Sequence, residues 1–414
     1  MGTRLVDSVT RASAALALLA TSPVAMLGAL WLGTRRQRMA VRRQHFQAPR
    51  GEPIRLFQLD APESRLATAL RIWLALADVA AGRLAIVGPR PRAMGETIAR
   101  QFRPGVLGAK PGLVSLWRVR SSALIDFESE DAIDAEYARD RSLRADAGIL
   151  LRHVLASLYG TRGGRIPAAT QFFGIRHLNL AMGELLDLFA VALRTRHRAR
   201  IAFVNPDCVN LAQRNPIYRA VLGRFDWVLT DGIGMRIAGR LLGQPVRQNV
   251  NGTDLFPRLC ALLETEGRSL YLLGGQPGVA EGVARWVRAR HPRLRIAGCH
   301  HGYLAPDEET AVIRAIRAAH TDVLLVGFGA PRQERWIAAH GDACGATLTF
   351  GVGGLFDYYS GRIPRAPQWL REVGGEWVFR LAQEPRRLWR RYLVGNFVFL
   401  VRVLRARGTA KETT

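Results

Sequence analysis

The chain has 414 residues, 48% hydrophobic and 22% charged, which excludes a disordered protein and allows two ordinary domains. Its formal net charge of +25 would suit a nucleic acid, but only Lys110 and Lys411 of the 59 basic residues are lysines, so a bias towards arginine explains much of it. The sequence contains no recognised nucleic-acid-binding module, so we predict no nucleic-acid partner. We expect the basic residues to attract anionic lipid headgroups or diphosphates.

The first predicted element is an uncharged apolar segment at residues 12–33, just long enough to cross a bilayer. Ser22 and Pro23 lie at its centre, and a proline disfavours a continuous helix because it lacks a backbone donor. Arginines flank both ends, so the positive-inside rule places both ends in the cytoplasm. We favour a re-entrant helical hairpin over a kinked spanning helix; a cleaved signal peptide is the third interpretation.

The next motifs of the predicted first domain, residues 1–160, are four sequence runs. They are RLVD at 4–7, LAIVGPRPR at 84–92, RPGVLGAKPGLVSLWRV at 103–119 and YARDRSLRAD at 137–146. In these runs the segment resembles the monotopic bacterial sugar transferases, the polyprenyl-phosphate phosphoglycosyl transferases that start lipid-linked glycans. The resemblance implies a membrane-associated, α-rich domain.

The resemblance also implies an Asp-Glu pair, in which the aspartate is the nucleophile and a nearby carboxylate helps to bind magnesium. At the family's spacing, Arg71 and Ile72 stand in place of this pair. We therefore expect an inactive domain that is kept as a membrane anchor. Arg90 and Arg103 either hold a phosphate or are solvated surface charges.

Glycine and arginine cluster after the first domain without apolar periodicity, which predicts a linker. We place this linker at residues 161–171, a second domain at residues 172–404 and a disordered tail at residues 405–414.

Short apolar runs that end in glycine, proline or an acid alternate with helical periods in the second domain. This alternation is typical of an α/β fold with a Rossmann-like, largely parallel sheet, whose ligands bind at the carboxyl ends of the strands. The residues expected along this edge are Asn205, Asp207, Asp231, Gly274, Gly275, Gly329 and Gln333.

Three motifs of this edge each have two interpretations. Asp231 follows an apolar strand and is either a helix N-cap or a general base. Gly274 and Gly275, in LLGGQPG, either offer backbone amides to a diphosphate or form only a tight turn. Glu334 is either a second acid or a residue that caps the start of a helix.

A further set of motifs extends over most of residues 172–404. It includes NPD at 205–207, TDGIG at 230–234, NGTDL at 251–255, GAPRQE at 329–334, FDYYSG at 356–361, RAPQW at 365–369 and EWVFRL at 376–381. In these motifs the chain resembles the WecG/TagA/CpsF glycosyltransferases. The resemblance implies inverting transfer of an N-acetylmannosamine-type or similar sugar from UDP to a lipid-linked diphosphate sugar, with no essential metal and no cofactor.

Carried onto this sequence, the family's roles make Asp231 the general base for the acceptor hydroxyl. They place Gln333 beside the reacting sugar and Asp357 against the nucleotide base. Because the implied donor is a UDP-sugar, we also assign Asn205, Gly274 and Gly275 to nucleotide-sugar binding.

Two positions depart from the family's pattern. Phe203 stands where a threonine is frequent, and Asn249 stands where an arginine is common. These departures leave the donor sugar open more than the type of reaction.

Arginines are expected to stabilise the negative charge that grows on the departing diphosphate, because no metal cluster is visible in the sequence. Arg380, Arg387 and Arg390 are spaced to share one helix face, although Pro385 interrupts the helix. We assign these arginines to the diphosphate and the lipid acceptor. The other interpretation is a basic amphipathic tail on the membrane, and both can hold. Its aromatic residues would be Trp377, Phe379, Trp389, Phe397 and Phe399.

These observations predict a glycosyltransferase of exopolysaccharide or cell-envelope glycan synthesis that uses a UDP-sugar donor and a polyprenyl-diphosphate-linked sugar acceptor. Four widely spaced cysteines without a CxxC pair indicate a reducing compartment, so we place the main domain on the cytoplasmic face of the inner membrane. The alternatives are a silent membrane scaffold and a bifunctional enzyme that also starts the lipid-linked chain. The sequence leaves a homo-oligomer open.

Overall fold

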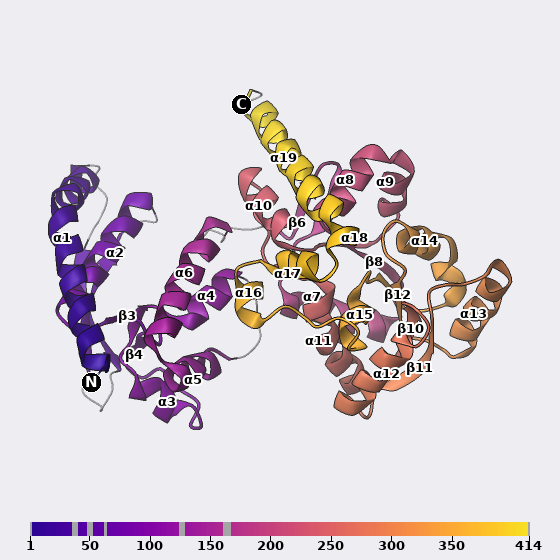
Figure 1. Cartoon of the computed structure of the whole chain (residues 1–414), viewed down its shortest axis with the longest axis horizontal. Coiled ribbons are helices and arrows are strands. Elements are labelled where there is room, and N and C mark those ends of the chain that lie inside the picture. Colours follow the sequence, from indigo (N-terminus) through magenta and orange to yellow (C-terminus); the bar gives the residue numbers. More distant parts are fainter. Residues whose placement is uncertain are drawn as a thin grey trace. The chain divides into compact units, whose positions relative to one another are not determined.

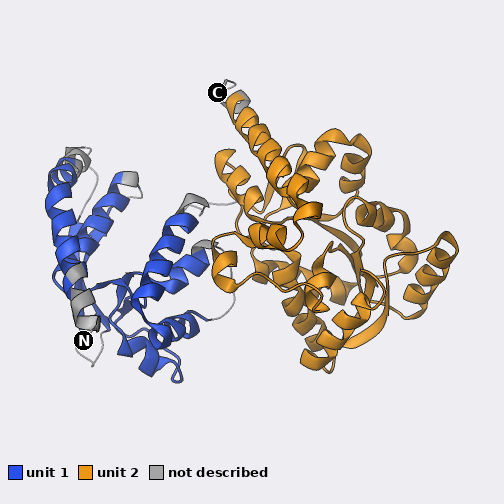
Figure 2. Cartoon of the chain, in the orientation of Figure 1, with its two compact units in different colours: residues 1–160 blue, residues 161–414 orange. Residues whose placement is uncertain are grey.

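The computed structural model describes residues 2–34, 40–47, 53–61, 64–123, 129–159 and 167–412. The chain forms two compact units, residues 1–160 and residues 161–414 (Figure 2). The elements of the first unit are, in chain order (Figure 1), α1 (Gly2–Thr34), β1 (Ala40–Gln47), β2 (Ile54–Asp60), α2 (Arg65–Ala80), β3 (Ala85–Val87), β4 (Arg92–Ala93), α3 (Arg103–Gly108), β5 (Gly112–Val114), α4 (Leu116–Ala123), α5 (Glu130–Asp140) and α6 (Leu143–Tyr159).

The apolar segment near the N-terminus lies in one helix, α1, which continues through Pro23. Pro23 has no N–H to donate to the carbonyl of Leu19, four residues earlier, and Oγ of Ser22 donates to that carbonyl at 3.0 Å instead. The prediction of a hairpin of two separate helices is therefore wrong. The stretch Thr10–Leu27 is long and apolar enough to span a membrane, and α1 packs along α2.

Two small sheets complete the first unit, with strand orders β2-β1-β4 and β3-β5. The helices α4, α5 and α6 close a small core around β3 and β5 through Val119, Ile133 and Ile149. The hydroxyl of Tyr137 donates to the carbonyl of Val87 at 3.0 Å, which fixes α5 against the end of β3.

The second unit contains a longer alternation of strands and helices. Its elements are β6 (Ala169–Phe172), β7 (Ile175–Leu178), α7 (Met182–Thr195), β8 (Ala199–Val204), α8 (Pro206–Arg214), α9 (Pro216–Leu222), β9 (Trp227–Thr230), α10 (Ile233–Leu241), α11 (Gly252–Thr265), β10 (Ser269–Gly274), α12 (Val279–Arg290), β11 (Arg295–His300), α13 (Pro306–Ala318), β12 (Val323–Gly327), α14 (Arg332–Cys344), β13 (Leu348–Gly351), α15 (Leu355–Tyr359), α16 (Gln368–Glu372), α17 (Glu376–Gln383), α18 (Pro385–Trp389), the π-helix η2 (Arg390–Val394) and α19 (Gly395–Glu412).

One eight-stranded sheet organises this unit, in the order β11-β10-β12-β13-β8-β9-β7-β6. All neighbouring strands are parallel except β6 and β7, which are antiparallel. Successive residues of β8 enter different cores: Ile201 and Phe203 join one cluster, and Ala202 and Val204 the other. Helices therefore cover both faces, which confirms the predicted α/β class with its largely parallel sheet.

Two boundaries differ from the expected ones. β6 begins at Ala169, so the sheet starts inside the segment that we expected to be a linker. α19 continues to Glu412, so the expected disordered tail is helical over most of its length. Phe399 and Val403 of α19 are buried where the helix packs against α8 and α10, and this burial anchors the helix.

Candidate active site

The strands β8 and β9 bring Asn205 and Asp231 to the same edge of the sheet. Val204 and Thr230 pair across the two parallel strands, and the next residue of each chain segment is Asn205 or Asp231. The backbone N–H of Asp231 donates to the carbonyl of Val204 at 2.9 Å. The two side chains therefore lie at the carboxyl ends of adjacent strands, where ligands of such sheets bind.

Asp231 is not the N-cap of the helix that follows it. That position belongs to Gly232, whose φ of 89° suits a glycine. The N–H of Gly232 is instead held by Oδ1 of Asn249, at 2.9 Å. Asn249 thus fixes the turn after Asp231, and the Asp231 carboxylate is left available for chemistry.

The surroundings of Asp231 make it a weaker acid than an ordinary aspartate. Burial, with help from the carboxylates of Glu376 and Asp254, raises the pKa of Asp231 to about 6, although Arg391 and a hydrogen bond from Asn205 lower it. A carboxylate with a pKa close to the working pH can accept a proton and later release it. Asp231 is therefore suited to act as a general base.

Asn205 connects α8 to this carboxylate. Its Oδ1 caps α8 by accepting from the N–H groups of Asp207 and Cys208, both at 3.1 Å. The side chain of Asn205 also acts on the Asp231 carboxylate, whose pKa it lowers through hydrogen bonding. The geometry supports a positioning role for Asn205; direct contact with a nucleotide-sugar stays a prediction.

Gln333 lies below the edge and is only 4% exposed. Its Oε1 accepts from the N–H of Gly329 at 3.1 Å and from that of Gly353 at 2.9 Å. Its Nε2 donates to Oε1 of Glu334 at 2.8 Å. Gln333 thus joins the loops after β12 and β13, and its expected contact with the sugar stays a prediction.

Glu334 is fully buried beside Gln333, and burial raises its pKa. It therefore lies inside the core of the unit, away from solvent. Glu334 lies in the first turn of α14, where its carboxylate is hydrogen-bonded to a backbone amide, in agreement with the interpretation as a residue that caps the start of a helix; a role as a second acid stays a prediction.

Gly274, the last residue of β10, and Gly275, which follows it, pack closely against the end of β12, and their expected contact with a nucleotide-sugar stays a prediction. Gly274 is buried, and a Cβ there would lie 2.7 Å from the backbone of Gly327. The N–H of Gly275 donates to the carbonyl of Gly327 at 3.2 Å, so it does not point at a diphosphate as expected. Close approach of β10 to β12 is the reason for glycine at position 274.

The three predicted arginines do not share one helix face. α17 ends at Glu384, whose φ of −131° and ψ of 58° interrupt the helix, and the π-helix η2 begins at Arg390. Arg387 is exposed and pairs with Glu384 at 2.8 Å, and the exposed Arg390 lies over the ring of Trp389. The prediction of a shared face is therefore wrong, because Pro385 starts a new helix.

Arg380 alone of the three reaches the sheet edge. It donates to the hydroxyl of Tyr358 at 3.0 Å, and its guanidinium lies over the ring of that tyrosine. A Cβ on Gly354 would lie 2.7 Å from Nη2 of Arg380, which shows that Arg380 covers the turn after β13.

Asp357 lies in the first turn of α15, close to this turn. Its Oδ1 accepts from Nη1 of Arg362 at 3.1 Å. The carboxylate is largely buried, and its expected contact with a nucleotide base stays a prediction.

The sequence analysis missed an ion-pair network beside Asp231. Nη2 of Arg365 bonds Oδ1 of Asp254 at 2.5 Å, and Nε of Arg365 lies 3.5 Å from Oε1 of Glu376. Asn251, the N-cap of α11, donates to the other oxygen of Asp254 at 2.6 Å. These residues belong to motifs that the sequence analysis noted without giving them a role. The network holds the chain after β13 against α11, close to the base.

In the first unit, Arg71 at the position of the expected Asp-Glu pair makes structural contacts. Nε and Nη2 of Arg71 donate to the carbonyls of Leu59 and Ala61, at 3.3 and 2.5 Å, so Arg71 ties α2 to the end of β2. Arg90 is paired with Glu96 and Glu130, which leaves little of its charge for a phosphate.

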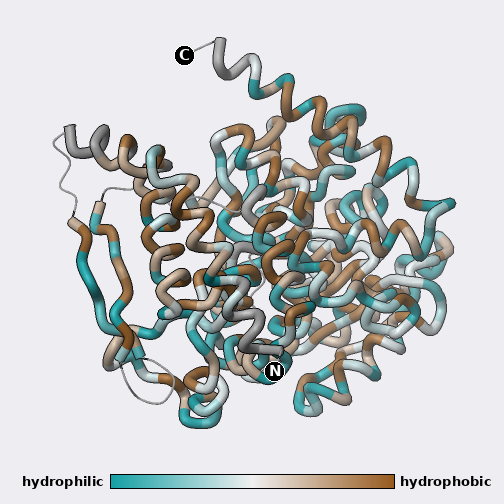
Figure 3. The backbone as a smooth tube through the Cα atoms, turned by 60° about the vertical axis from the view of Figure 1, so that its left-hand side comes forward, coloured by the Kyte–Doolittle hydropathy of each residue, from teal (hydrophilic) through white to brown (hydrophobic). Residues whose placement is uncertain are grey.

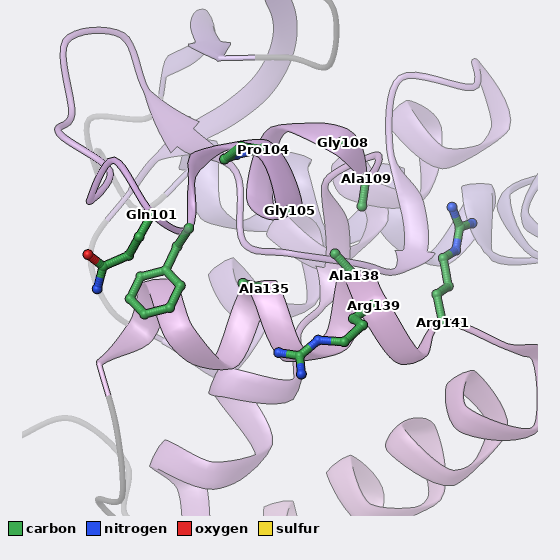
Figure 4. Close-up of a pocket in the computed structure, with 10 residues that line it drawn as sticks. Gln101, Pro104, Gly105, Gly108, Ala109, Ala135, Ala138, Arg139 and Arg141 are labelled. Atoms are coloured by element: carbon green, nitrogen blue, oxygen red, sulfur yellow. The ribbon is translucent and has the colours of Figure 1, made fainter.

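A pocket of about 560 Å³ lies between α3 and α5 of this unit (Figure 4). Most of the residues that line it are small, and two of them, Arg139 and Arg141, are basic. The side chains of these two arginines point in different directions (Figure 4). None of the predicted site residues lines it, so the sheet edge of the second unit is the candidate active site. The lining residues are Gln101, Phe102, Pro104, Gly105, Gly108, Ala109, Ala135, Ala138, Arg139 and Arg141.

Comparison with known proteins finds a family model that matches most of the second unit and another that matches part of the first. Residues 170–413 match the glycosyl transferase WecG/TagA/CpsF family, and residues 70–160 match the bacterial sugar transferase family. The chain is 32% identical to an N-acetylglucosaminyldiphosphoundecaprenol N-acetyl-beta-D-mannosaminyltransferase of Bacillus subtilis (strain 168), over 47% of this chain and 75% of the relative. It is 28% identical to a protein of the same name from Staphylococcus aureus (strain MW2), over 59% of this chain and 96% of the relative.

Proposed function

The chain belongs to the WecG/TagA/CpsF family of glycosyl transferases, and we propose that it moves a sugar from a UDP-sugar to a polyprenyl-diphosphate-linked sugar with inversion at the anomeric carbon. The observation that carries this proposal is the position of Asp231: a carboxylate at the end of β9 with a pKa raised to about 6. A base of this strength, next to a turn covered by Arg380, suits sugar transfer.

In the proposed reaction, Asp231 takes the proton of the acceptor hydroxyl while that oxygen attacks the anomeric carbon. The bond from this carbon to the diphosphate of UDP breaks, and UDP leaves with the electron pair. Arg380 stabilises the negative charge that grows on the departing diphosphate. Asn205 and Asn249 act by fixing the carboxylate and the turn after it.

The relatives' names support the class of acceptor. Both act on N-acetylglucosaminyldiphosphoundecaprenol and transfer an N-acetylmannosaminyl group. We propose a similar lipid-linked acceptor for this chain and leave the donor sugar open, because Phe203 and Asn249 depart from the family's pattern. The position of Phe203 supports leaving the donor sugar open, since its ring packs in the core beside Gly252 and offers no hydroxyl to the edge of the sheet.

We propose that the protein works at the cytoplasmic face of the inner membrane. The first unit matches a family of bacterial sugar transferases, and α1 contains a stretch able to span a bilayer. The C-terminal helices carry exposed apolar side chains among arginines. The tube in Figure 3 is coloured by the hydropathy of each residue, and hydrophobic and hydrophilic residues both occur along its C-terminal helix. Such a surface suits anionic lipids. Its exposed apolar residues are Trp389, Leu393, Val394, Phe397, Leu400 and Leu404.

The experiment that tests the function uses the full chain in nanodiscs. It is mixed with polyprenyl-diphosphate-linked N-acetylglucosamine and a panel of UDP-sugars, beside the variant Asp231→Asn, and the lipid product is followed by mass spectrometry. We expect one added sugar with the wild type and a loss of about 100-fold or more in the variant. Absence of product from every donor, with no binding of UDP, would support a silent scaffold.

A further inference from the structure

A basic side chain of the C-terminal segment lies close to the candidate base. Arg391 is the second residue of η2, and its Nε lies 3.2 Å from Oδ2 of Asp207 in the first turn of α8. The amide of Asn210, also on α8, donates to the carbonyl of Gly395 at 2.7 Å, so the chain on the C-terminal side of Arg391 is fixed to the same helix. These two contacts fix the position of the Arg391 guanidinium relative to α8.

The position matters because α8 starts directly at the sheet edge that holds Asp231. Asn205 caps α8 and is hydrogen-bonded to Asp231, and Asp207 lies two residues further along. An arginine held by Asp207 is therefore near the base, and Arg391 does act electrostatically on Asp231.

Most charges around Asp231 oppose its ionised form. Glu376 on α17 and Asp254 on α11 both disfavour a second negative charge nearby. Arg365, which could offset them, is bound to both of these carboxylates. Tyr392, next to Arg391 on η2, also faces this group of charges, and its phenol is neutral at working pH because its pKa is raised. Arg371 on α16 likewise lies 3.7 Å from Asp254, whereas Arg391 is a cation that acts on Asp231 itself.

We propose that Arg391, anchored by Asp207, is a positioning residue that keeps the Asp231 carboxylate ionised when the negatively charged donor and acceptor enter the site. This inference rests on the proposed function, in which Asp231 is the base. It adds a residue to which neither the motifs nor the predicted set of arginines had assigned a role. Both side chains of the Arg391–Asp207 pair are partly exposed, at 40% and 47%, so the pair itself adds little stability.

The expected consequence is a change in the pH dependence of turnover. Removing the cation raises the pKa of Asp231, so a larger fraction of the base is protonated at low pH. At high pH the base is ionised with or without Arg391. Activity should therefore fall at low pH and be retained at high pH.

The test measures kcat against pH from 5 to 8.5 for the full chain in nanodiscs, with the substrates described above. The variants are Arg391→Gln, Arg391→Met, which keeps the length of the side chain, and Arg391→Lys. The matched control is Arg314→Gln, which removes an exposed arginine from α13, away from the candidate site and from the C-terminal helices. Thermal unfolding verifies that each variant is folded.

We expect the acid limb of Arg391→Gln and Arg391→Met to move to higher pH by about one unit, with up to about a tenfold loss at low pH. Arg391→Lys and Arg314→Gln should keep the wild-type profile. An unchanged profile, or an equal loss at every pH, in folded Gln and Met variants would overturn the inference. Failure of the proposed function gives a different result from failure of this inference. In that case the wild type itself transfers no sugar, or Asp231→Asn stays active.

Discussion

The guanidinium of Arg380 occupies the space in which a side chain on Gly354 would lie, because a Cβ there would be 2.7 Å from Nη2 of Arg380. The backbone of Gly354, with φ of −82°, is one that alanine adopts without strain. An added methyl group would therefore displace the guanidinium of Arg380, which is the far end of a flexible side chain and can move.

We predict that Gly354→Ala lowers kcat/KM about tenfold, the equivalent of one charge-assisted contact of about 1.4 kcal/mol. Steady-state kinetics with the lipid-linked acceptor measure this effect. Gly183→Ala is the matched control, because Gly183 is an exposed helical glycine with open space around it. Equal activity of both variants would mean that Arg380 takes no part in the reaction.

We predict that Asp231→Asn stabilises the protein at neutral pH. The pKa of Asp231 is raised from 3.8 to about 6 in the folded chain, so the unfolded chain loses this proton first. Stability therefore falls between about pH 4 and pH 6 and stays lower above that range. The Tm of the variant should exceed that of the wild type at pH 7.5, and the difference should disappear near pH 4. A Tm difference of constant size across this range would contradict the raised pKa.

We predict that Gln333→Ala destabilises the second unit by about 2 kcal/mol, since it removes bonds to the loops after β12 and β13 and leaves buried groups unpaired. Denaturant unfolding measures the loss, and Gln276→Ala, at an exposed position, is the control. If the glutamine also contacts the sugar, kcat will fall in conditions where the variant is fully folded. Wild-type stability of the variant would show that these bonds contribute little.

We predict that the wild type does not start a lipid-linked chain, because Arg71 and Ile72 replace the carboxylates of an active phosphoglycosyl transferase. The assay follows release of UMP from UDP-sugars in the presence of polyprenyl phosphate. Arg71→Ala should lower the Tm, since Arg71 bonds the carbonyls of Leu59 and Ala61, and should leave sugar transfer by the second unit unchanged. Release of UMP by the wild type would establish the bifunctional alternative.

The strands, and the polar residues at the carboxyl edge of the sheet, could be predicted because both depend on local sequence. Apolar runs such as that of β8 end directly at a polar residue, and a parallel sheet brings such ends together. The contacts of Arg365 and Arg391 could not be predicted, since each joins segments more than 100 residues apart. Spacing on an ideal helix also failed for Arg387 and Arg390, because a proline and a π-helix change the direction of successive side chains.

Secondary structure at the ends of the second unit depended on tertiary packing. The residues after 405 have no sustained apolar pattern, yet α19 extends over them as a continuation of a helix whose earlier residues, Phe399 and Val403, are buried. β6 likewise forms because it pairs with β7, whose partner β9 lies far along the chain. Neither cause is visible in a short window of sequence.

The place of Arg71 in the first unit also bears on how this protein could evolve. Its side chain now supports the end of β2, so a change back to aspartate would remove two hydrogen bonds before the neighbouring Ile72 had regained a carboxylate. The intermediate would be less stable and still inactive, and selection would have no reason to retain it. On the prediction that the first unit is inactive, the protein depends on another enzyme to supply the first lipid-linked sugar.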